Sequence, residues 1–161
     1  MFKLNYNNAK DEALKVLGNF FFLNPPINPI HIAKHYNIDV HFADFHNDEV
    51  SGMYDCDKNI IYVNENDSDN RKIFTIAHEL GHYFMHRDWT KTKDYQAFSR
   101  KFSKDKKELE ANAFAEHLLV PKKMLDRFYK FATLEELCDI FKVSAGVIQR
   151  RLDTEYCENH I

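Results

Sequence analysis

The sequence lacks the features that mark membrane-spanning and disulfide-stabilised chains. None of its apolar runs approaches the ~18 residues needed to cross a bilayer, and residues 1–5 lack the apolar stretch of a secretory signal. Cysteine is rare: Cys56, Cys138 and Cys157 are an odd number and form no C-x-x-C pair. Free thiols of this kind are typical of a reducing compartment. We therefore expect a cytoplasmic protein with no membrane partner.

Glycine, proline and excess positive charge are also scarce. Four Gly and four Pro stand against 14 Phe and 8 Tyr in 161 residues, so the chain has enough large apolar side chains for a core and is not expected to be disordered. The formal net charge is −3, whereas nucleic-acid-binding domains are usually basic. The composition therefore disfavours nucleic acid as the main partner.

Apolar periodicity and turn signals predict a domain of the α+β class. Helices are predicted at residues 8–20, 29–36, 71–87 and 106–119. Alternating apolar residues predict strands at residues 38–42, 50–54 and 59–63. We expect the strands to form a small, mostly antiparallel three-stranded sheet that packs on the helix at residues 71–87.

The end of the chain is predicted to be a helical extension, residues 122–161, packed on a core formed by residues 1–121. Thr133 and Glu136 match a capping box, and Ser144 is a suitable N-cap for a last helix. These two helices resemble a helix–turn–helix.

One motif has the spacing of a metal site. Residues 78–82 are His-Glu-Leu-Gly-His, an H-E-x-x-H match whose two His lie one turn apart if the segment is helical. At about 100° per residue, the apolar residues of 73–84 gather on one face of this helix, and His78 and His82 lie on the opposite face. Glu79 lies beside the pair, which suits a base that addresses a metal's bound water.

A third ligand is available in the helix predicted at residues 106–119. Catalytic zinc usually has three protein ligands and one open position. Glu108 lies at the edge of the apolar stripe, where a carboxylate is costly unless it is paired or metal-bound. Asn112 lies one turn later and would orient a ligand. Two alternatives stay open: Glu110, which periodicity directs toward solvent, as the ligand, or Glu108 as a rim carboxylate paired with a lysine.

Both motifs closely resemble the ImmA/IrrE family of metallopeptidases. The likeness is carried by IFTIAHELGHYFMH at residues 73–86, by the Glu-x-Glu-Ala-Asn-x-Phe-Ala run at 108–115 and by Leu-Leu-Val-Pro at 118–121. Ser-Gly at 51–52, residues 60–64 and the short helix at 29–36 also fall where that family has them. The resemblance covers roughly residues 25–152.

The resemblance implies a zincin-like, gluzincin-type peptidase that hydrolyses a protein partner. Zinc held by His78, His82 and Glu108 would activate water, and Glu79 would be the general base; manganese or iron is the alternative metal. Several members cleave an Xre-type DNA-binding repressor, and others are carried beside toxin–antitoxin genes. We therefore expect a cognate repressor or an antitoxin-like partner as substrate.

Other side chains are candidates for binding the substrate or its transition state, which needs a donor besides the metal. These are His86, one turn after His82, and Tyr83, Tyr54 and His117, for which an ordinary structural role is the alternative. An extended substrate is expected to add to the sheet edge near residues 60–63. Residues 91–107, with seven Lys/Arg against two Asp, form either a solvated loop or a basic flap that faces the substrate.

Two other functions stay open. A non-hydrolytic, metal-binding antirepressor is possible, although an intact Glu79 counts against it. A DNA-binding regulator would use Gln149, Arg150 and Arg151 of the last helix. Residues 133–161, however, carry six Asp/Glu and three Lys/Arg, and phosphate contacts require positive charge. Direct nucleic-acid binding is therefore not expected.

Overall fold

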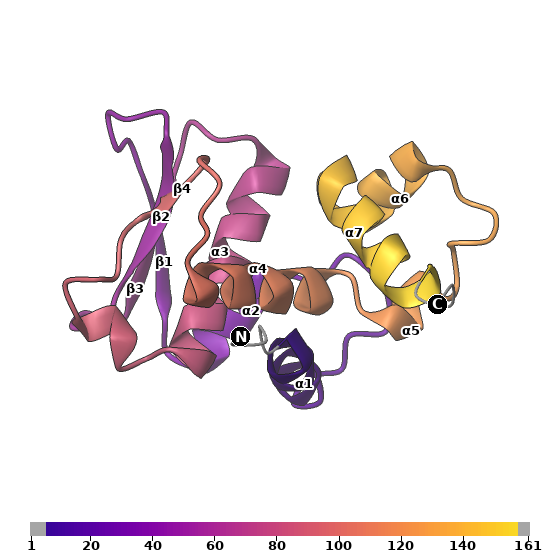
Figure 1. Cartoon of the computed structure of the whole chain (residues 1–161), viewed down its shortest axis with the longest axis horizontal. Helices are drawn as coiled ribbons and strands as arrows, with labels where there is room; N and C mark the ends of the chain where they lie inside the picture. Colours follow the sequence, from indigo (N-terminus) through magenta and orange to yellow (C-terminus); the bar gives the residue numbers. More distant parts are fainter. Residues whose placement is uncertain (1–5, 158–161) are drawn as a thin grey trace.

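The computed structural model describes residues 6–157, in which seven α-helices, one 3-10 helix and four strands form a mixed α+β fold (Figure 1). The predicted fold class is confirmed. Residues 1–5 and the last four residues of the predicted extension lie outside the described residues, and the division of the chain at residue 121 stays a prediction. Within residues 6–157, no helix combines the length and hydropathy that a bilayer span requires.

The sheet differs from the predicted one. Its strands are β1 (Asp39–Ala43), β2 (Val50–Asp55), β3 (Ile60–Asn64) and β4 (Phe98–Ser99), in the order β1-β3-β2-β4. β2 and β3 are antiparallel, but β1 is parallel to β3. The prediction of three mostly antiparallel strands is therefore wrong, because alternation reports a strand and not its partner or direction, and because β4 is too short to alternate.

The position of β3 also overturns the expected substrate edge. β3 pairs with β1 on one side and with β2 on the other, so residues 60–63 have no free edge. The strand between β3 and β4 is β2, which packs against α3 (Asp69–Met85). Any strand-like ligand close to α3 would therefore add to β2, where β4 lies.

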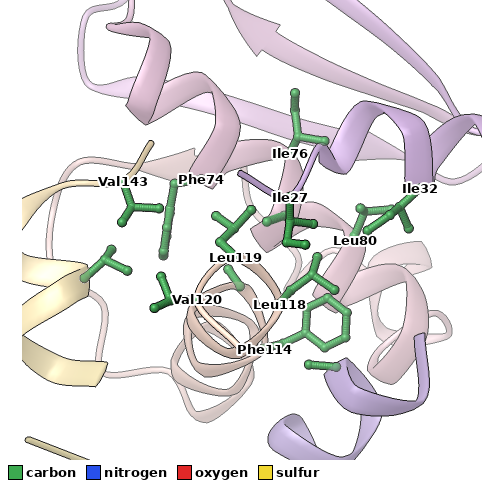
Figure 2. Packing of buried hydrophobic residues seen from close by; sticks show 14 of the residues in the cluster. Ile27, Ile32, Phe74, Ile76, Leu80, Phe114, Leu118, Leu119, Val120 and Val143 are labelled. Atoms are coloured by element: carbon green, nitrogen blue, oxygen red, sulfur yellow. The ribbon is translucent and has the colours of Figure 1, made fainter. Parts of the chain in front are cut away.

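The helices match the predicted ones closely. The ends of the four predicted helices shift by only a few residues. The observed helices are α1 (Tyr6–Leu17), α2 (Pro29–His35), α3 and α4 (Lys106–Leu119). Asn28 caps α2 by accepting from the N–H of Ile30 at 3.0 Å, and Ser68 caps α3 by accepting from that of Arg71 at 3.3 Å. Figure 2 shows Leu80 of α3 and Phe114 of α4 within the same buried hydrophobic cluster.

Two glycines allow α3 to be packed from both sides. A Cβ at Gly52 of β2 would lie 2.5 Å from Thr75 Cγ2 and 2.5 Å from the Tyr62 carbonyl oxygen. A Cβ at Gly81 would lie 3.1 Å from Phe114 Cδ1 and 3.2 Å from Ala111 Cα. The absence of a side chain at these two positions brings β2 and α4 close to α3.

The C-terminal helices are α5 (Lys122–Leu125), α6 (Leu134–Phe141) and α7 (Ala145–Tyr156). The capping box of Thr133 and Glu136 is confirmed, as is the Ser144 cap. Arg151 is buried: its Nε donates to the Val120 carbonyl at 3.0 Å and its Nη2 to Glu155 Oε1 at 2.7 Å. Arg151, one of the two arginines that the DNA-binding alternative would use, thus ties α7 to the end of α4.

We expect Gly52→Ala to destabilise the fold by about 1–3 kcal/mol, because the new methyl group overlaps backbone as well as side-chain atoms. Denaturant unfolding measures the change. Gly18→Ala is the matched control, since its Cβ would meet only ordinary contacts at 3.4 Å and 3.5 Å. Equal stability of the two variants would contradict this account of the β2–α3 contact.

Candidate metal centre

α3 presents the residues of the H-E-x-x-H motif from two successive turns. His78, Glu79 and His82 are each 0% exposed. The sequence places the two imidazoles on the face opposite the core, and that face is buried too, because α4 and the segment that follows α3 cover it. The site is therefore an internal one.

The side chain of Glu108 reaches both histidines from α4. His78 Nε2 and His82 Nε2 lie 3.1 Å apart. The Glu108 carboxylate lies 3.1 Å from the first of these atoms and 2.9 Å from the second. Three potential ligand atoms from two helices thus converge, in the combination that the sequence predicts.

Hydrogen bonds behind His78 set its tautomer. Its Nδ1 lies 2.8 Å from Asn112 Oδ1. An amide oxygen only accepts, so Nδ1 carries the proton and Nε2 presents its lone pair toward Glu108. Asn112 therefore contacts His78, as expected, and holds this imidazole in the tautomer whose Nε2 lone pair is free.

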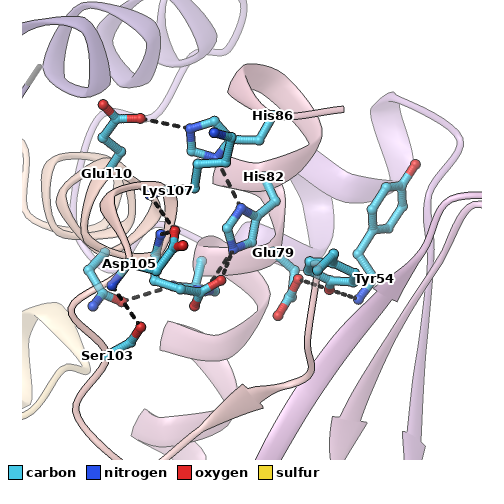
Figure 3. A network of polar contacts seen from close by, with 12 residues as sticks. Tyr54, Glu79, His82, His86, Ser103, Asp105, Lys107 and Glu110 are labelled. Carbon is cyan, nitrogen blue, oxygen red and sulfur yellow. Dashed lines mark hydrogen bonds and ion pairs between the residues drawn. The ribbon is translucent and has the colours of Figure 1, made fainter. Parts of the chain in front are cut away.

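A longer chain of contacts sets the tautomer of His82 (Figure 3). Its Nδ1 lies 3.0 Å from His86 Nδ1, and His86 Nε2 lies 2.9 Å from Glu110 Oε2. Because the carboxylate accepts, His86 carries its proton on Nε2, and its Nδ1 accepts from His82 Nδ1–H. His82 Nε2 is then unprotonated and also faces Glu108.

The donor set fits a cation such as Zn²⁺. Burial raises the pKa of the Glu108 carboxyl, and hydrogen bonds donated by the two imidazoles would lower it. With both Nε2 atoms unprotonated these bonds are not made, so the buried carboxylate needs a cation to balance its charge. Two imidazole lone pairs and a carboxylate that converge in a buried space repel one another unless a cation lies between them. Zinc bonds of about 2.0–2.2 Å in tetrahedral geometry place ligand atoms roughly 3.3 Å apart, close to the separations found here.

Glu79 lies beside this group and is not one of its members. Its Oε2 accepts from the Tyr95 hydroxyl at 2.7 Å, and its buried Oε1 has no hydrogen-bond partner in the described part of the chain. Burial, the largest influence, raises the pKa of Glu79 to about 7, although His82 and Tyr95 act to lower it. One carboxylate oxygen is thus fixed, and the other is left available.

Sequence reasoning missed three aromatic residues that enclose the site. They come from the 3-10 helix Trp89–Lys91 and from the polar segment after it. The Phe98 ring stacks on His78 with centroids 3.8 Å apart, and Trp89 lies 5.2 Å from His82. Tyr95 contacts Glu79. The only signal in the sequence is that these large side chains occur within an otherwise charged and polar stretch.

Other predicted candidates lie elsewhere. Tyr83 packs edge-on against Tyr54, whose hydroxyl donates to Asn59 Oδ1 at 2.8 Å. His117 lies 4.0 Å from Glu155 of α7. Among these candidates, the structure brings only His86 into contact with the group of His78, His82 and Glu108.

The prediction that Glu110 points toward solvent is wrong. Glu110 is 9% exposed and binds His86. Helical periodicity describes α4 alone, whereas the last turn of α3 lies against the side of α4 that carries Glu110. In this structure Glu110 supports His82 through His86 and is not itself among the converging ligand atoms.

A cavity of ≈ 680 Å³ borders Glu108 and Asn112. Basic side chains line it on several sides, namely those of Arg71, Arg100, Lys101 and Arg150. Glu108, one of the three converging residues, keeps 15% of its side chain exposed.

This chain is similar to several known proteins. Residues 33–153 match Peptidase_M78, the IrrE N-terminal-like domain. "Uncharacterized immunity region protein 2" of Bacillus phage phi105 is 36% identical over 96 residues, 58% of this chain and 59% of that protein. "Metallopeptidase ImmA" of Bacillus subtilis (strain 168) is 34% identical over 99 residues, 60% of this chain and 56% of that protein. The matches thus span little more than half the length of these relatives.

A solved structure shares the fold at low sequence identity. It is described as a "Mycobacterium tuberculosis transcriptional regulator" and superposes with a TM-score of 0.68 at 17% identity, over 98% of this chain and 50% of the other. Fold and site together define a domain of the H-E-x-x-H class. Since the family match covers most of the chain, the protein belongs to the Peptidase_M78 family.

We expect the wild-type protein, purified without chelator or affinity nickel, to contain about one zinc per chain. Glu108→Ala should lose most of it, because one of three converging ligands is removed. Mass spectrometry of the metal content measures this. Glu110→Gln is the control, since its side chain reaches the ligands only through His86. Full metal retention in Glu108→Ala, with loss in Glu110→Gln, would reverse the assignment of the third ligand.

Proposed function

We propose that this protein is a zinc-dependent endopeptidase. His78, His82 and Glu108 hold the metal, and Glu79 is the general base. The observation that carries the proposal is the convergence of three unprotonated ligand atoms next to a buried carboxylate with one free oxygen. Family membership supports the same reaction class. Imidazole and carboxylate ligands also suit manganese and iron, which are the alternative metals.

The ligands and Glu79 divide the chemistry between them. Zinc, when bound, supplies a Lewis acid and a water of lowered pKa. Glu79 Oε1, which lacks a partner in the described residues, is available to take a proton from that water and pass it to the leaving amine. The raised pKa of Glu79 suits this role, because a base near neutrality both accepts and returns a proton.

The contacts behind the ligands contribute orientation. Asn112 and the pair His86–Glu110 keep the two imidazoles in the tautomers that bind metal. His86 thereby acts on His82 and does not contact the substrate. The Tyr95 hydroxyl fixes one oxygen of Glu79, so the other oxygen takes a defined direction.

The proposed substrate is a protein partner, namely a cognate DNA-binding repressor of the Xre type or an antitoxin-like protein. One relative is named a metallopeptidase, and another is named for the immunity region of a phage. These two names support a repressor that maintains phage immunity as the proposed target. Such a substrate implies action in the cytoplasm.

We expect Glu79→Gln to reduce cleavage of the co-expressed cognate repressor by about 10²-fold or more, because an amide accepts no proton. Metal content should stay at the wild-type level, since Glu79 is outside the ligand group. Cleavage products are followed by mass spectrometry of both proteins. Normal cleavage by Glu79→Gln would remove this residue as the base. A wild-type protein that binds the repressor and never cuts it would favour the antirepressor function.

The rival DNA-binding function has its own test. Arg151 is buried against α4 and Arg150 pairs with Glu116, so both arginines already have protein partners. We therefore expect no retardation of duplex DNA by the full chain at low salt. A shift that added salt reverses would restore the DNA-binding function.

A further inference from the structure

The edge of β2 beside the metal centre is occupied by the chain itself. We name residues 95–99 the strap. Its β4 part pairs antiparallel with β2, with Ser99 opposite Val50 and Phe98 opposite Gly52. Further along the same edge, the backbone N–H of Tyr54 donates to the Tyr95 hydroxyl at 2.6 Å. In an added peptide strand, a backbone carbonyl would take the place of this hydroxyl.

The strap also covers the chemical groups. Phe98 stacks on the ligand His78 at 3.8 Å, and the Tyr95 hydroxyl donates to Glu79 at 2.7 Å. His78, Glu79 and His82 have no exposed surface with the strap in this position. A substrate carbonyl must come within bonding distance of the metal and of the water that Glu79 serves. The closed strap therefore excludes an extended peptide from the productive position.

The strap is held by few backbone contacts. Its ladder with β2 is two residues long and contains an irregularity. The residues on either side, 91–94 and 100–102, are exposed. Charged contacts anchor the C-terminal side, where Arg100 pairs with Asp67 and its N–H donates to the Glu49 carbonyl at 2.8 Å. A short ladder between exposed flanks opens at lower free-energy cost than the core.

We propose that the strap is an intramolecular substitute for substrate, which keeps the peptidase closed until a cognate protein segment displaces it from the β2 edge. This inference rests on the proposed function and assigns its regulation. The exchange replaces one set of backbone hydrogen bonds with another, so it favours a partner that adds contacts elsewhere. Generic unfolded proteins are then poor substrates, although they supply extended segments.

A reversible cross-link tests the proposal. Val50→Cys/Ser99→Cys places two thiols at directly opposed positions of β2 and the strap. Met53→Cys/Tyr62→Cys is the matched control, because it links β2 to β3, which are already neighbours in the sheet. Mass spectrometry of proteolytic fragments verifies each bond against pairing with Cys56, Cys138 or Cys157. A phosphine reductant opens the bonds without supplying a thiol that competes for zinc.

Two readouts separate the strap from the peptidase function. The first is cleavage of the cognate repressor, which the oxidised Val50–Ser99 variant should lose by about tenfold or more and regain on reduction, because the strap no longer opens. The second is the rate at which a zinc chelator removes the metal, which oxidation should slow in the same variant. The oxidised control should match its reduced form in both measurements.

An opening variant tests the opposite direction. Phe98→Ala removes the stack on His78, so we expect faster removal of zinc by the chelator and new cleavage of casein.

If the oxidised and the reduced forms of the Val50→Cys/Ser99→Cys variant lose zinc at the same rate and cleave the repressor at the same rate, the strap is not a barrier and the proposal is wrong. If no form of the protein cleaves the repressor but the oxidised cross-link still slows removal of zinc by the chelator, the proposed peptidase function is contradicted. The proposal that the strap opens and closes is then still supported.

Discussion

The site depends on the close approach of α3 and α4. Gly81 lies in the middle of the H-E-x-x-H motif and faces Ala111 and Phe114, so the two helix backbones come nearly into contact. Because α4 lies so near, the short side chains of Glu108 and Asn112 reach the histidines of α3 directly. The same contact buries Leu80 and Phe114 in the core (Figure 2). The packing of the core and the convergence of the proposed metal ligands are therefore set by one interface.

Behind the ligands, the polar groups form two separate supports. Asn112 fixes His78, and Glu110 fixes His82 through His86 (Figure 3). Each support fixes the tautomer in which the proton is on Nδ1, so the Nε2 atom that faces Glu108 is unprotonated. Two lone pairs and a carboxylate then face one another, an arrangement that a cation would stabilise. A buried site of this kind is costly without its ion, so metal binding and the integrity of the α3–α4 interface are linked.

The segment between α3 and α4, residues 86–105, covers the H-E-x-x-H motif and leaves its residues with almost no exposed surface. Its aromatic residues bind inward, on His78 and Glu79, whereas most of its charged residues face solvent. The segment is thus neither a plain solvated loop nor simply a basic flap.

The sequence by itself determined what local geometry controls. An i, i+4 spacing on a helix placed His78 and His82 on one face, and the caps Thr133 and Ser144 marked where helices begin. Tertiary structure alone decided the parallel pairing of β1 with β3, the burial of Glu110 against His86, and the positions of Tyr95 and Phe98. These features join residues distant in the chain, and periodicity within one element carries no information about which other element will face it.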